Sequence, residues 1–224
     1  MLKLIIGNKA YSSWSLRGWL AVKQSGLPFE EVVVPLYDDA WATRKQQNDL
    51  APSAGKVPTL WNDQTPVWDS LAIIDYLNDL TGGTRFWPQD LAARGMARSM
   101  AAEMHAGFVS LRRACPMNTR RIFDPVTPNE AIAADLHRIQ QLWAQARASY
   151  GSQGDFLFGR FGAADIMFAP VVSRMVSYQL PLERFARHYV DALMAHPWMQ
   201  DWIAAAQDED WVLDQYEQQP VLDS

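Results

Sequence analysis

Hydrophobic positions recur with two different spacings in the first part of the chain, which predicts a mixture of strands and helices. Apolar residues at helical spacing predict a helix over residues 15–25, ending before Gly26. Continuous apolar or β-branched runs predict strands over residues 2–6 and 29–34. Also predicted are a polar helix over residues 40–50, a hairpin pairing residues 59–61 with 67–68, and a helix from Ser70 that ends before Gly82.

After Gly82 and Gly83 the strand signals end and only helical periodicity remains. One apolar stripe predicts a single long helix and consists of Met96, Met100, Met104, Phe108 and Leu111. Further helices are predicted around residues 132–143, 163–176, 182–195 and 198–206. We therefore predict an α/β domain over residues 1–81, a linker over residues 82–89 and an all-α domain over residues 90–224.

Composition narrows the function classes. The chain has 224 residues, 49% of them hydrophobic and 20% charged, with a net charge of −5, which is typical of a globular protein. Its basic clusters are no longer than pairs such as Arg112-Arg113, so a nucleic-acid-binding surface is not expected. The lone Cys115 excludes an intramolecular disulfide, and no metal-ligand cluster is visible. No apolar run is long enough for a membrane span, so we expect a cytoplasmic protein without a membrane partner.

The candidate chemistry is concentrated in residues 56–77. Pro58 begins a short apolar strand, and a cis Val57–Pro58 bond would leave the Val57 backbone free to pair with an extended peptide. A proline at the edge of a strand explains the same residue without a ligand. Asp69 and Ser70 begin the next helix, where free amides favour a carboxylate and an acid favours an ammonium group. A small peptide with a free amino-acid head offers the extended backbone, the carboxylate and the ammonium group that these residues would bind.

Three segments together resemble the cytosolic glutathione transferases, specifically their serine-type, zeta-like members. They are the serine-rich residues 11–17, residues 56–77 and residues 158–165. The resemblance implies an N-terminal thioredoxin-like domain, a C-terminal helical bundle, glutathione as co-substrate without a metal, and a homodimer. Gly162 departs from the family, which usually has serine or threonine there. Glycine lacks a side-chain acceptor, so we predict a weaker helix start at this position.

The resemblance also assigns roles to residues. A serine hydroxyl would stabilise the glutathione thiolate: counting back from Arg17 favours Ser13, the serine doublet favours Ser12, and Ser15 is the third candidate. These serines could equally cap a helix. Glutathione itself would contact Lys56, Val57, Pro58, Asp69 and Ser70, with Arg44 or Lys45 near its glycyl carboxylate.

An apolar electrophile pocket is expected at Trp14, Met104, His105 and Phe108, although core packing explains the same stripe. The predicted reaction is conjugation of glutathione to a small apolar electrophile, as in detoxification. One alternative is a zeta-type isomerase of a maleylacetoacetate-like diacid. That class carries an arginine seven residues after a proline in the helix that starts near residue 163. Counted from Pro170, this chain has Ser177 at that position, and Arg174 lies one turn earlier. The other alternative is a non-enzymatic interaction protein with the same fold.

Overall fold

The first part of the chain forms a four-stranded mixed sheet. The computed structural model describes residues 1–220. The strands β1 (Leu2–Gly7), β2 (Phe29–Val34), β3 (Thr59–Asn62) and β4 (Thr65–Val67) lie in the order β2-β1-β3-β4. Strand β1 pairs parallel with β2 and antiparallel with β3, and β3 and β4 form an antiparallel hairpin. The predicted strands and hairpin are confirmed.

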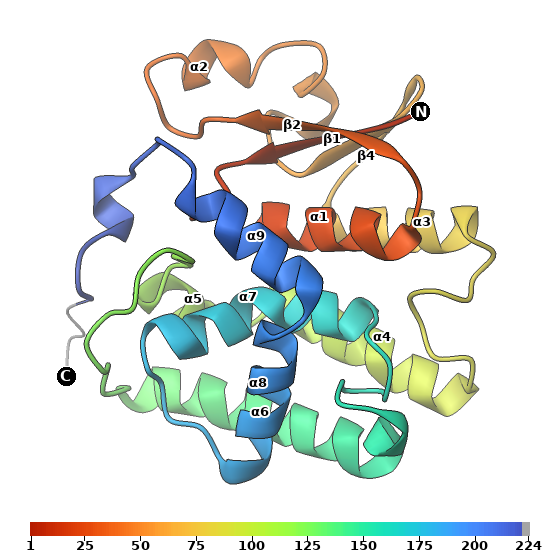
Figure 1. Ribbon diagram of the computed structural model, residues 1–224, viewed down its shortest axis with the longest axis vertical. Coiled ribbons are helices and arrows are strands. Elements are labelled where there is room, and N and C mark those ends of the chain that lie inside the picture. Colours follow the sequence, from red (N-terminus) through yellow and green to blue (C-terminus); the bar gives the residue numbers. More distant parts are fainter. Residues whose placement is uncertain (221–224) are drawn as a thin grey trace.

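The central strand β1 is buried on both faces, which explains its continuous apolar run. Leu4 and Ile6 contribute to the main core, whereas Ile5 contributes to a small cluster on the opposite face. Helices α1 (Ser13–Ser25) and α3 (Ser70–Leu80) cover the main-core face. The other face is covered by the segment that contains α2 (Trp41–Arg44) and the single turn Ala51–Ser53 (Figure 1).

The rest of the described chain is helical, as predicted. The helices are α4 (Leu91–Ala106), α5 (Val109–Ala114), α6 (Glu130–Tyr150), α7 (Ala163–Ser177), α8 (Arg184–Met194) and α9 (Pro197–Gln207), with short turns at Gly151–Gln153 and Asp214–Tyr216. Helix α1 lies between the sheet and this helical part (Figure 1) and packs against α7. No helix within residues 1–220 is long and apolar enough to cross a membrane.

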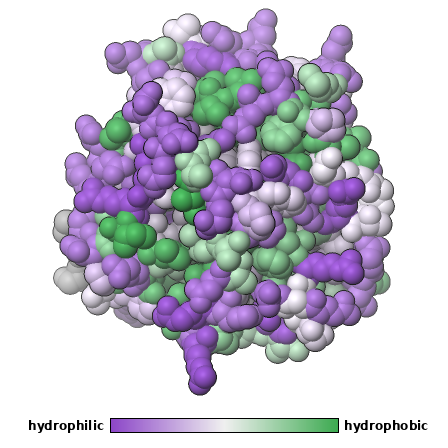
Figure 2. All heavy atoms as spheres, viewed as in Figure 1, coloured by the Kyte–Doolittle hydropathy of each residue, from purple (hydrophilic) through white to green (hydrophobic). Residues whose placement is uncertain are grey.

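One hydrophobic core runs through both parts. It joins β1, α1 and α3 to α4, α6 and α7, and its fully buried aromatic residues include Trp143 and Phe168. Hydrophilic residues cover most of the face in Figure 2, and hydrophobic residues reach it in separated groups. The sheet part and the helical part therefore pack against each other through a shared hydrophobic core.

The predicted long helix through Phe108 is broken into two. Helix α4 ends at Ala106, and α5 begins at Val109 after Phe108 adopts a left-handed backbone conformation with φ of 57°. A Cβ on Gly107 would lie 2.7 Å from the Glu103 carbonyl oxygen, so this tight turn accommodates only glycine without a shift. The break turns α5 away from α4.

The predicted polar helix over residues 40–50 is also shorter than expected. Only Trp41–Arg44 is helical, and i→i+3 bonds from Gln46 to Thr43 and from Gln47 to Arg44 replace the helical ladder. This segment has few apolar positions to bury, so tertiary packing stabilises little of it as a helix. Arg44 instead pairs with Asp49 through both guanidinium nitrogens, at 2.7 and 2.9 Å.

Gly162 is required by packing at the start of α7. Asp165 accepts hydrogen bonds from the Gly162 amide at 2.9 Å and from the Leu157 amide at 3.1 Å. The Phe86 carbonyl of the linker approaches so closely that a Cβ on Gly162 would lie 2.7 Å from it, and it accepts a bond from the Ala163 amide at 2.9 Å. Gly162 provides no capping side chain, as expected. However, the Phe86 carbonyl of the linker accepts a hydrogen bond from the first turn of α7 in its place.

Replacing Gly162 by the serine typical of the family should destabilise this protein. We expect Gly162→Ser to lower the free energy of unfolding by about 1–3 kcal/mol, because the side chain forces the Phe86 carbonyl away. The matched control is Gly95→Ala, where a Cβ meets no atom within 4 Å inside α4. That control should gain up to about 1 kcal/mol from helix propensity. Urea denaturation measures both, and a stabilised Gly162→Ser variant would contradict the packing argument.

Candidate functional site

Two adjacent cavities meet at the start of α1. The first has a volume of about 580 Å³ and lies beside the Val57–Pro58 strand start; the second has a volume of about 440 Å³ and lies toward the helical part. Both are lined by Ser12, Trp14, Leu36 and Tyr37. The N-terminal turn of α1 therefore faces a continuous space with one compartment on each side.

The first cavity collects most of the predicted peptide-binding residues. Lys56, Val57, Pro58 and Asp69 line it, and the Val57–Pro58 bond is cis. Lys45 lines it as well, whereas Arg44 is held by Asp49.

Ser70 differs from its neighbours because its side chain is completely enclosed. The residue is 0% exposed, and its Oγ has no hydrogen-bond partner among the described residues. It is the first residue of α3, directly after the capping residue Asp69, whose carboxylate accepts a bond from the Leu71 amide at 3.0 Å. A buried hydroxyl without a partner is costly. Ser70 lines neither cavity, although the adjacent Asp69 lines the first one.

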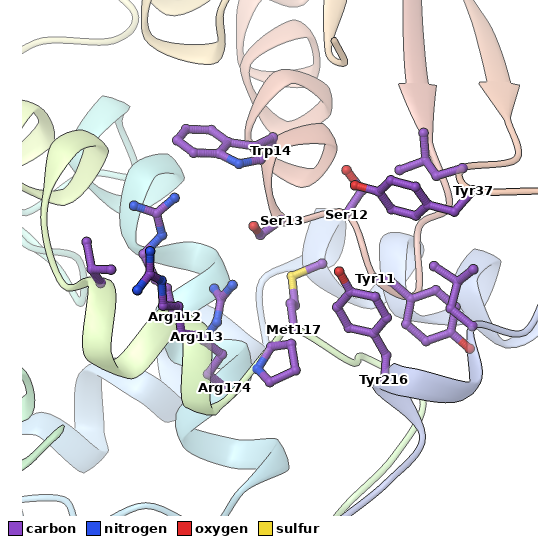
Figure 3. Close-up of a pocket in the computed structure, with 14 residues that line it drawn as sticks. Tyr11, Ser12, Ser13, Trp14, Tyr37, Arg112, Arg113, Met117, Arg174 and Tyr216 are labelled. Carbon is purple, nitrogen blue, oxygen red and sulfur yellow. The ribbon is translucent and has the colours of Figure 1, made fainter. Parts of the chain in front are cut away.

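The three candidate serines have different surroundings. Ser15 is fully buried, accepts bonds from the Gly7 amide at 2.9 Å and from the Ser12 hydroxyl at 2.7 Å, and lines neither cavity. Ser12 caps α1 and lines both cavities, but its hydroxyl proton is directed to Ser15. Ser13 lines the second cavity, and its hydroxyl bonds to no residue within 1–220 (Figure 3). Ser13 is thus free to donate to a ligand.

The predicted electrophile-pocket residues are divided by the fold. Met104 and Phe108 belong to the core and line neither cavity, because the break after α4 turns that stripe inward. Trp14 does line both cavities. His105 lies on the wall of the first one, with its Nε2 3.1 Å from Asp69 and its ring edge-on to Trp14. Two of the four expected residues, Trp14 and His105, therefore lie at the first cavity.

Apart from Ser12, Ser13 and Trp14, the second cavity is lined by residues that the sequence patterns did not assign to a pocket. Arg112 and Arg113 come from α5, Arg174 from α7, and Tyr37 and Tyr216 from loop segments (Figure 3). The Arg112-Arg113 pair is visible in the sequence, but only as a short basic cluster. Arg174 faces the cavity, whereas Ser177 donates its hydroxyl to the Asn118 carbonyl.

Burial depresses the pKa of several of these arginines. The pKa of Arg174 falls to about 10, first because the side chain is desolvated and second because Arg112 lies near. Desolvation also lowers the pKa of Arg112 and, together with the charges of Arg174 and Arg112, that of Arg17. All three remain cationic at neutral pH.

Two family models match the chain. One describes the N-terminal domain of glutathione S-transferases and matches residues 11–80, and the other describes the C-terminal domain and matches residues 129–205. Together they cover more than half of the chain. This chain belongs to the glutathione S-transferase family. The prediction of a glutathione S-transferase with a thioredoxin-like first domain and a helical second domain is thereby confirmed.

Individual relatives agree with this assignment. Protein IN2-1 of Zea mays is 24% identical over 197 residues, which cover 86% of this chain and 72% of that protein. Glutathione S-transferase U10 of Arabidopsis thaliana is 31% identical over 97 residues, or 43% of this chain and 40% of that protein. A glutathione transferase homologue from Burkholderia, solved with bound glutathione, has a TM-score of 0.67 at 23% identity, covering 93% and 99% of the two chains. This structural likeness shows a shared fold.

The contacts of the serines predict opposite results for two alanine variants. Ser15→Ala should lower the free energy of unfolding by about 1–3 kcal/mol, because it leaves the buried Gly7 amide without an acceptor. Ser13→Ala should change it by less than about 0.5 kcal/mol, since no bond is lost. Urea denaturation of both variants provides the measurement. Equal losses would show that the Ser13 hydroxyl has a structural partner.

Proposed function

We propose that this protein is a serine-type, zeta-like glutathione transferase. It holds glutathione in the first cavity, keeps the thiol ionised with the Ser13 hydroxyl, and transfers the sulfur to a small electrophile in the second cavity. The observation that carries the proposal is the Ser13 hydroxyl, which lines the second cavity at the start of α1 and has no bonding partner within residues 1–220. The enclosed Ser70 hydroxyl, next to Asp69 of the first cavity, also has no partner among these residues. The expected assembly and location are a cytoplasmic homodimer.

The residues around the first cavity match the groups of a γ-glutamyl tripeptide. The Val57 backbone is suited to pair with the cysteinyl residue, as in the addition of a strand. The Ser70 hydroxyl and the N-terminus of α3 suit the γ-glutamyl carboxylate, and the half-exposed Asp69 suits the ammonium group. Lys45 and Lys56 supply cations near the glycyl carboxylate. Each group of the peptide thus has a complementary side chain or backbone group.

The Ser13 hydroxyl and the N-terminus of α1 together can supply the free energy needed to ionise the thiol. A free thiol has a pKa of about 8.5, and lowering it by two units requires about 2.7 kcal/mol of preferential stabilisation of the thiolate. A hydrogen bond to a charged group contributes about 1.5–3 kcal/mol and a helix N-terminus about 0.3–1 kcal/mol. Ser13 acts as a hydrogen-bond donor, and the thiol proton passes to water.

Ser70→Ala should separate binding from stability. We expect the affinity for glutathione to fall by about tenfold or more, because a charge-assisted hydrogen bond is lost. The unliganded protein should be as stable as before or more stable, since the variant removes a buried hydroxyl that has no partner. Isothermal titration calorimetry and urea denaturation measure the two effects.

The matched control is Ser110→Ala, on α5 and lining neither cavity. If wild-type protein fails to bind glutathione, both in calorimetry and on glutathione resin, the proposed function is wrong and the non-enzymatic interaction protein is favoured. If it binds glutathione but conjugates no electrophile, the binding half of the proposal stands and the enzymatic half fails.

Ser13→Ala should raise the pKa of the bound thiol by about one to two units while leaving the affinity for glutathione nearly unchanged, because the hydroxyl acts on the thiolate. The ultraviolet absorbance of the thiolate, followed against pH at saturating glutathione, measures the shift. Conjugation at neutral pH should slow by about tenfold or more. Ser12→Ala is the comparison: a shift confined to that variant would assign the thiolate contact to Ser12.

A further inference from the structure

The second cavity has cations on one wall and no acid among the described residues that line it. Arg112, Arg113 and Arg174 gather on one side of the opening, facing Ser13 and Trp14 (Figure 3). Within residues 1–220, the other lining residues are serines, tyrosines and apolar residues. The charge pattern differs sharply from the apolar pocket that the sequence predicted.

Within residues 1–220, these arginines have no carboxylate partner, whereas several other arginines do. Arg120 pairs with Glu209, Arg121 with Glu217 and Arg138 with Glu103. By contrast, Arg174 donates only to the carbonyls of Cys115 and Pro170, at 2.8 and 3.0 Å, and Arg112 only to that of Gly107, at 3.2 Å. Arg113 is exposed, and no described residue forms an ion pair or hydrogen bond with it.

A fourth cation, Arg17, lies close enough to Arg174 and Arg112 for their charges to lower its pKa. Arg17 is 1% exposed, donates its Nε to the Met167 carbonyl at 3.0 Å, and has an Nη1 without a partner among the described residues. The ring of Trp14 is close to the guanidinium groups of both Arg17 and Arg112, whose carbons are 4.7 and 5.0 Å from its centroid. Carbonyl partners orient these groups, and the nearby carboxylate of Asp69 offsets part of the charge of Arg17.

The lowered pKa of Arg174 reflects the same excess of charge, since Arg112 contributes to it after burial. Placing like charges in a poorly solvated wall costs free energy that a bound anion would offset. Arginine is also the side chain best suited to hold a carboxylate through two parallel hydrogen bonds.

We propose that the second cavity selects electrophiles that carry a carboxylate, with Arg113 and Arg112 holding the carboxylate and Arg174 supplying charge from behind. The inference rests on the proposed function, because it names the acceptor for the same thiolate. With a chlorodinitrobenzoate as acceptor, the thiolate sulfur bonds to the ring carbon bearing chlorine. The carbon–chlorine bond breaks, and chloride leaves with the bonding electron pair.

The test compares a chlorodinitrobenzoate with its methyl ester, which undergoes the same reaction without the negative charge. Wild-type protein should show a higher kcat/KM for the acid than for the ester after correction for the uncatalysed rates. In Arg113→Gln the ratio of the two values should fall about tenfold, through KM for the acid. The control is Arg187→Gln, an exposed arginine on α8 that lines neither cavity and removes the same charge. Its ratio should equal that of the wild type.

Three outcomes would overturn the inference while leaving the proposed function intact. The first is a wild-type ratio of kcat/KM for the acid to that for the ester at or below one. The second is the same ratio in Arg113→Gln and in the wild type. The third is a raised KM for glutathione in Arg113→Gln, which would assign the arginine to a carboxylate of the tripeptide. If neither acceptor reacts although glutathione binds, the transferase proposal fails and a binding experiment decides the inference.

That experiment uses dinitrobenzoate, which has no leaving group, titrated by calorimetry at saturating glutathione. Binding to the wild type that is about tenfold tighter than to Arg113→Gln, with no such difference for the methyl ester, supports the anion site. Equal affinities for the acid in the two proteins refute it.

Discussion

The burial of α1 between the sheet and the helical part is the constraint on which the site depends. Leu16 and Leu20 are fully enclosed in the shared core, and Arg17 reaches across to the Met167 carbonyl of α7. Because packing on both sides fixes the helix, its first turn is accessible to a ligand only where the sheet and the helical part meet. Ser12, Ser13 and Trp14 therefore lie at the junction of both cavities.

Electrostatics give that junction a character opposite to the protein as a whole. The chain carries a net charge of −5, yet the second cavity is lined by three arginines and the first by two lysines. The N-termini of α1 and α3 add partial positive charge at the same place. A locally positive, partly buried region within an acidic protein concentrates anionic ligands and stabilises a thiolate. The fold positions these charges through backbone carbonyls, which orient guanidinium groups without neutralising them.

Much of the fold and half of the candidate site could be predicted locally. The segment around Val57 and Asp69 carries its information in adjacent residues: a proline at a strand start and an acid-serine pair at a helix start. The Ser12–Ser15 cluster indicated the right turn but could not rank its members, since their roles depend on Gly7 and on the cavity. Among the residues expected around the electrophile, Trp14 and His105 line a cavity, whereas Met104 and Phe108 belong to the core. The stripe that joins Met104 to Phe108 meets a turn at Gly107 whose tightness depends on the Glu103 carbonyl, which no local pattern indicates.

Short-range patterns in the sequence were sufficient to predict the order of strands and helices and the change to an all-helical second part. They also indicated the residues of the first cavity that suit a peptide. Each of these features depends on residues close together in the sequence. Long-range packing alone brought Arg112, Arg113 and Arg174 onto one wall, where none of them pairs with a carboxylate of the described residues. It also placed Gly162 against the Phe86 carbonyl, where a side chain would not fit without a shift. Charge compensation and close approach are properties of groups distant along the chain, so no local pattern records them.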